Sequence, residues 1–103
     1  MHTDPPYLSH FGELATLKCT IASWYHQDAY LDFDSDQAIW SDIMSSHDEP
    51  SRQRIIFQLR ELLNRTDQEI MALWNANSHS HLYRDPNEAK RFLTDMLSYF
   101  EQF

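Results

Sequence analysis

The sequence predicts an all-α fold, a compact single-domain bundle of about five short helices. Glycine is nearly absent, because Gly12 is the only one among 103 residues. Asn-Gly and Asp-Gly pairs are missing, and apolar and polar residues never alternate over a long stretch, so β-hairpins are not indicated. Apolar residues recur at helical spacing instead. We expect one domain over residues 1–103, with an N-terminal tail at about 1–8.

Three of the expected helices lie before position 65. The first covers about 9–25, the second runs from 35 or 36 to about 46, and the third covers about 49–64. Each repeats apolar residues every three or four positions, which places them on one face of a helix. Proline at position 50 suits the first turn of the third helix. The apolar residues are Leu14, Leu17, Ile21, Trp24, Ile39, Trp40, Ile43, Met44, Ile55, Ile56, Leu59, Leu62 and Leu63.

Two further helices are expected from their start signals. Thr66 with Glu69 matches a capping box, in which the threonine hydroxyl accepts from the Glu69 amide while the glutamate reaches back. The helix that follows ends in the polar stretch 75–80. Asp85 as N-cap and Pro86 at the first position then begin the last helix. Its apolar face consists of Ala89, Phe92, Leu93, Met96, Leu97 and Phe100. The remaining long connection, 26–34, is expected to be irregular.

Charge is distributed very unevenly. The formal net charge is −8. Residues 1–49 contain nine acidic residues and one basic residue, Lys18, whereas residues 50–103 contain seven of each. The whole net charge therefore lies in the first half. Such a surface repels phosphate backbones and attracts a cationic protein. We expect no nucleic-acid partner.

The sequence offers little support for metal, disulfide or membrane roles. A single cysteine excludes an internal disulfide, and we expect Cys19, within the first helix, to be a buried or half-buried thiol. Apolar runs are too short to span a bilayer, and the N-terminal segment does not have the pattern of a signal peptide. We expect a cytoplasmic domain without a membrane partner. Asp32-Phe-Asp34-Ser-Asp36 opens like a calcium loop, but Gln37 and Ile43 stand where that loop needs glycine and glutamate.

The segment Ser23-Trp-Tyr-His-Gln-Asp28, followed by Ala-Tyr-Leu-Asp-Phe-Asp-Ser, resembles the immunity proteins of contact-dependent growth inhibition, the CdiI family. The resemblance continues in the same order through the helix start at Glu49-Pro50, the capping box at 66–69 and the final helix after Asp85. It covers about 11–103. The chain departs from the family pattern at Ala29, where an aromatic residue is common.

The resemblance implies a cytosolic antidote that binds one-to-one to a basic toxin domain, the C-terminal part of a large surface protein. Many such toxins are nucleases, especially ribonucleases that act on tRNA, and the charge of this chain suits a cationic nuclease cleft. We expect no enzymatic activity, no cofactor and no metal, and a monomer when free. The antidote either occludes the toxin's active cleft or binds beside it.

The expected residues fall into two sets. The shared motif is expected to maintain the architecture, and the exposed acidic and aromatic residues around it are expected to contact the toxin, since carboxylates pair with Lys and Arg. The structural set is Tyr25, His26, Gln27 and Asp28. The toxin-binding set is Tyr30, Asp32, Asp34, Asp36, Asp42, Asp48 and Glu49, with Tyr30 as a buried aromatic anchor.

Two alternatives remain open on the sequence. One is a generic acidic module for protein interaction or regulation, which would dock another basic partner. The other is a small metal-dependent or acid–base enzyme that uses His26 with Asp28, or His79 with His81.

Overall fold

A computed structural model describes residues 14–103, and it confirms the all-α prediction: this part of the chain contains six helices and no strand. The expected tail at 1–8 and the expected start of the first helix, 9–13, lie outside the described residues. The helices are α1 (Ala15–Trp24), α2 (Ala29–Asp32), α3 (Asp36–Ser45), α4 (Glu49–Leu63), α5 (Asp67–Asn77) and α6 (Pro86–Gln102).

Helices α3 to α6 each begin at a side chain that satisfies a free backbone N–H. Ser35 accepts from the Ala38 amide, and Asp48 accepts from the Ser51 amide. The Thr66 hydroxyl accepts from the Glu69 amide at 3.2 Å, as expected, but the Glu69 carboxylate lies against that same hydroxyl rather than reaching the Thr66 N–H. Asp85 accepts from the Asn87 amide. Local sequence therefore sets these four helix starts.

The sequence predicted that the segment 26–34 is irregular. This is wrong for part of the segment, because the short helix α2 forms within it. The Asp32 amide donates to the Asp28 carbonyl at 3.1 Å, and the Phe33 amide donates to the Ala29 carbonyl at 3.0 Å. Ala29 is fully buried in the core cluster. Tertiary packing thus stabilises a turn that is far too short to be stable alone.

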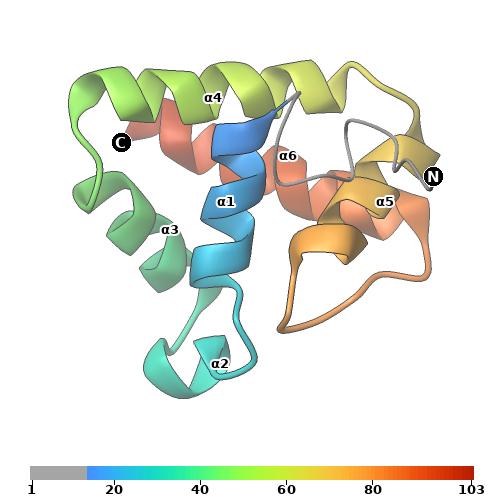
Figure 1. The fold of residues 1–103 in the computed structure, drawn as a ribbon, viewed down its shortest axis with the longest axis horizontal. Helices are drawn as coiled ribbons and strands as arrows, with labels where there is room; N and C mark the ends of the chain where they lie inside the picture. The colour runs from blue at the N-terminus through green and yellow to red at the C-terminus, as the bar shows by residue number, and fades with distance from the viewer. Residues whose placement is uncertain (1–13) are drawn as a thin grey trace, which may run out of the picture.

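The core lies between α1 at the front and α6 at the back (Figure 1). Helix α6 contacts α3, α4 and α5, and α1 contacts the same three helices. Helix α4 crosses one end of the molecule, and α2 lies at the opposite end with the α5–α6 loop (Figure 1). Leu17, Ile21, Leu93 and Met96 belong to the same buried cluster. This arrangement leaves α2 outside the main bundle, joined to it at the ends of α1 and α3.

The core position of Leu93 gives a stability test. Leu93 is fully buried, whereas Leu82 is well exposed. We expect Leu93→Ala to lower the free energy of unfolding by about 2–5 kcal/mol, because truncation leaves a cavity. The matched control Leu82→Ala is expected to change it by less than about 0.5 kcal/mol. Urea unfolding followed by circular dichroism measures both, and similar losses in the two variants would contradict this core.

Candidate functional site

The residue that follows α1 is a buried tyrosine whose hydroxyl both donates and accepts a hydrogen bond. Tyr25 is fully buried. Its hydroxyl donates to Asp36 Oδ1 at 3.0 Å and accepts from Trp40 Nε1 at 3.0 Å. Burial and the neighbouring Asp36 carboxylate raise the pKa of Tyr25 far above its usual value, so the phenol remains a neutral donor.

A second tyrosine, on α2, uses the same carboxylate oxygen. The Tyr30 hydroxyl donates to Asp36 Oδ1 at 2.7 Å. Partial burial and the hydrogen bond to Asp36 raise the pKa of Tyr30 as well. Asp36 is the first residue of α3, where the positive end of the helix dipole favours a carboxylate. One aspartate therefore joins the end of α1, the helix α2 and the start of α3.

The α5–α6 loop completes this cluster with His81, which lies half-buried among five aromatic rings. Nδ1 of His81 lies 3.4 Å from the Tyr30 hydroxyl and 3.2 Å from Ser80 Oγ, and Nε2 lies 3.1 Å from the Tyr83 hydroxyl. Burial lowers the pKa of His81, while Asp36 acts in the opposite direction. The ring centroids around His81, at 5.0–5.9 Å, belong to Tyr25, Tyr30, Trp74, Tyr83 and Phe92.

The backbone of this loop is fixed at several points. Trp74 Nε1 donates to the His81 carbonyl at 3.0 Å. The Asn75 side chain pairs with the backbone of Tyr83, donating at 2.8 Å and accepting at 2.8 Å. The His79 amide donates to the Tyr25 carbonyl at 2.7 Å. The loop is thereby held against the end of α1 although it has no regular secondary structure. Burial, Asp36 and Glu88 raise the pKa of the Tyr83 phenol to about 12.

The expected toxin-binding residues do not form one group. Asp32 and Asp34 are exposed at the α2 end. Asp36 is half-buried and uses its carboxylate within the protein. Asp48 and Glu49 lie at the α3–α4 junction, separated from the α2 end by the whole of α3 (Figure 1).

Three of these acidic residues also have local roles. Asp42 accepts from Trp24 Nε1 at 2.8 Å, which ties α3 to α1. Asp48 caps α4, and the hydrogen bond from Ser51 lowers its pKa. Glu49 accepts from Gln53 Nε2 at 2.8 Å along α4. These three carboxylates thus lie near the surface, but each already accepts a hydrogen bond from within the chain.

In the motif expected to be structural, only the tyrosine is buried. His26 is half-exposed, and Gln27 and Asp28 are exposed. Nδ1 of His26 accepts from the Asp28 amide at 3.1 Å, and Nε2 lies 3.5 Å from Asp32 Oδ2. The imidazole therefore faces the carboxylate of Asp32. The enzyme alternative had instead paired His26 with the carboxylate of Asp28. Asp28 is the N-cap residue of α2, but its side chain makes no capping hydrogen bond.

Sequence reasoning missed the exposed apolar side chains at this end. Leu31 is 84% exposed and Leu82 is 63% exposed. Tyr30, expected among the residues that contact the toxin, is 46% exposed, because α2 lies at the margin of the bundle and only its Ala29 enters the core. The available signal was weak: Leu31 and Leu82 are apolar residues in polar surroundings that fit none of the expected helical faces.

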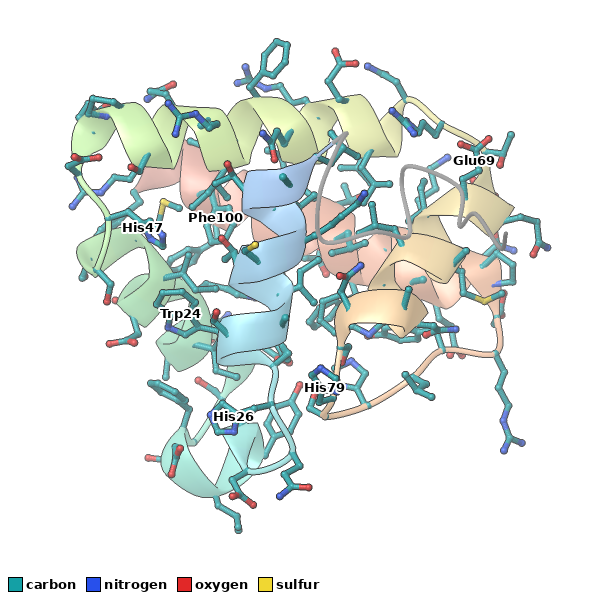
Figure 2. All side chains as sticks on the ribbon, in the orientation of Figure 1. Trp24, His26, His47, Glu69, His79 and Phe100 are labelled. Atoms are coloured by element: carbon teal, nitrogen blue, oxygen red, sulfur yellow. The ribbon has the colours of Figure 1, made fainter. Side chains whose placement is uncertain are left out.

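A shallow groove of about 320 Å³ runs along α1, and it exposes the cysteine that we expected to be buried or half-buried. Cys19 lies two positions from both Leu17 and Ile21, which face the core, so its side chain points to the opposite side of the helix. The rings of Trp24 and His47, 5.3 Å apart, contribute to the wall of this groove (Figure 2).

The described part of the chain contains no group of three or more His, Cys, Asp or Glu side chains placed to hold a metal ion. His79 is exposed, whereas His81 lies within the aromatic cluster. Within residues 14–103, no helix is both long enough and apolar enough to cross a membrane.

Comparisons with known proteins add no relative. No family model, no curated protein and no solved structure matches this chain.

The burial of His81 predicts how stability depends on pH. The unfolded chain binds a proton at His81 near pH 6.5, whereas the folded protein resists protonation until a lower pH. The contribution of His81 to stability is therefore fully present above about pH 6.5 and is lost as pH decreases below it. We expect His81→Asn to show a smaller loss of stability between about pH 7 and 5, and the exposed control His79→Asn to keep the loss of the unmodified protein. Urea unfolding at several pH values measures this, and equal losses in both variants would contradict it.

Proposed function

We propose that this chain is an immunity protein of a contact-dependent growth inhibition system, which binds and neutralises the nuclease toxin domain of its own system. The observation that carries the proposal is the concentration of the entire net charge of −8 in residues 1–49. The resemblance of residues 23–35 to the CdiI family supplies the kind of partner. A nuclease that handles a polyanion has a cationic cleft, which an acidic protein complements.

The geometry supports binding by the α2 end of the molecule. Asp28, Asp32 and Asp34 are exposed there within seven positions. The only basic residue in the first half, Lys18, is fully buried in α1. The cationic partner therefore meets carboxylates at α2 without competing surface lysines or arginines from the same half. Occlusion of the toxin's cleft is the simplest way for this face to inhibit.

The same acidic face suits a generic interaction module that docks another basic protein. The reading frame next to the gene for this chain distinguishes the two functions. An adjacent reading frame for a large surface protein with a C-terminal toxin domain supports the immunity function, and the absence of one supports the generic module.

The acidic face gives a kinetic test with that toxin domain. We expect Asp32→Asn with Asp34→Asn to slow association about tenfold at low salt and to flatten its salt dependence, because steering by charge is lost. Asp36 is left unchanged, since it holds Tyr25 and Tyr30. Stopped-flow fluorescence at two salt concentrations measures the rates, and calorimetry measures the one-to-one stoichiometry.

The matched control removes the same charge from the other half. Glu61 and Asp95 are exposed on α4 and α6, so Glu61→Gln with Asp95→Asn is expected to leave the rate within about twofold of the unmodified protein. Equal rates for both double variants would show that α2 is not the docking face. Failure of the unmodified protein to bind the toxin domain encoded beside it would contradict the immunity function.

A further inference from the structure

The α2 end exposes several large apolar side chains. Within residues 14–103, five such side chains are exposed, and three of them, Tyr30, Leu31 and Leu82, belong to α2 and the α5–α6 loop. The other two stand apart: Phe57 lies on α4, and Phe103 packs with Arg52, whose guanidinium lies 5.2 Å from its ring centre. Single exposed apolar residues are ordinary, but several on adjoining segments indicate a binding surface.

The two segments adjoin through Tyr30 and His81. Their ring centres are 5.9 Å apart, and the Tyr30 hydroxyl lies 3.4 Å from His81 Nδ1. Leu31 and Leu82 are the next residues in sequence after this contact. Figure 1 places α2 and the α5–α6 loop at the same end of the molecule. Figure 2 shows His26, in the turn before α2, and His79, in the α5–α6 loop, at that end.

Both segments are fixed before any partner arrives. Helix α2 is anchored by the buried Ala29 and by the hydrogen bond from Tyr30 to Asp36. The loop is anchored where Trp74 Nε1 and Ser78 Oγ both donate to the His81 carbonyl, at 3.0 and 2.9 Å. A surface that is already ordered loses little conformational entropy on binding, which favours affinity.

The charges around these side chains select the kind of partner. Leu31 lies among the exposed carboxylates Asp28, Asp32 and Asp34, while Leu82 is followed by the oppositely charged, exposed residues Arg84 and Asp85. The acidic border on the α2 side repels anionic lipid headgroups, nucleic acid and a second copy of the same face. It attracts a cationic protein surface. An apolar centre within a polar border is the usual anatomy of a protein–protein interface.

We propose that α2 and the α5–α6 loop form one composite docking surface, in which Leu31 and Leu82 enter apolar pockets of a cationic protein partner. This inference rests on the proposed function for the class of partner. It adds that carboxylates alone do not account for binding, since the apolar centre supplies affinity and the border supplies steering.

The probe is a pair of synthetic peptides with the same number of lysines, one with leucine and tryptophan between them and the other with serine and glycine. We expect the unmodified protein to bind the apolar cationic peptide at least about tenfold more tightly, by calorimetry. Leu31→Ser with Leu82→Ser should abolish this preference and leave binding of the polar peptide unchanged. Phe57→Ser, which removes an exposed apolar ring outside the surface, should leave the preference intact.

Three outcomes would overturn the inference: equal affinity for both peptides, no binding of the apolar peptide, or a preference that survives Leu31→Ser with Leu82→Ser. Self-association through this face, detected by ultracentrifugation and abolished in that variant, would identify a second copy as the occupant instead. Circular dichroism verifies that each variant folds, as exposed positions should allow.

The two proposals fail separately. Toxin binding that is insensitive to Leu31→Ser with Leu82→Ser would overturn the composite surface and leave the immunity function standing. A peptide preference that depends on these leucines, without any toxin binding, would overturn the immunity function alone.

Discussion

The candidate face, formed by α2 and the α5–α6 loop, depends on the hydrogen bonds that the Asp36 carboxylate accepts. One of its oxygens accepts from Tyr25 at 3.0 Å and from Tyr30 at 2.7 Å. Both phenols have strongly raised pKa values, so they donate at any physiological pH. Hydrogen bonds to a charged acceptor are roughly twice as strong as neutral ones. This network runs from the buried Tyr25 to the partly exposed Tyr30, and it determines where α2 lies relative to the bundle.

This network divides the acidic residues into two kinds. Asp36 is half-buried and fixes the scaffold, whereas Asp32 and Asp34 are exposed and carry negative charge at the surface. Tyr30 belongs to both groups, because its hydroxyl binds Asp36 while almost half of the side chain remains exposed. Its contact with His81 joins α2 to the α5–α6 loop. The face is therefore ordered by the core rather than by its own surface interactions.

Much of the fold could be predicted because its signals are local. Thr66 and Asp85 cap helices with hydrogen bonds to amides two or three residues away, so their roles are visible in the sequence. Helix α2 was missed, since four residues show no periodicity and Ala29 is held by tertiary packing. The role of Asp36 was also missed, because it depends on a hydroxyl brought from the end of another helix. The exposure of Leu31 could be found only once the bundle had been assembled.

The most direct test of this account is amide hydrogen exchange in α2, measured by NMR at the Asp32 and Phe33 amides, which donate to Asp28 and Ala29. In Asp36→Asn we predict that protection at these amides falls at least about tenfold, since the charged acceptor is lost. Protection in the middle of α6 should fall less, and Asp34→Asn, which removes the same charge from the surface, should change neither. Unchanged protection of α2 in Asp36→Asn would contradict the claim that this carboxylate holds the candidate face in place.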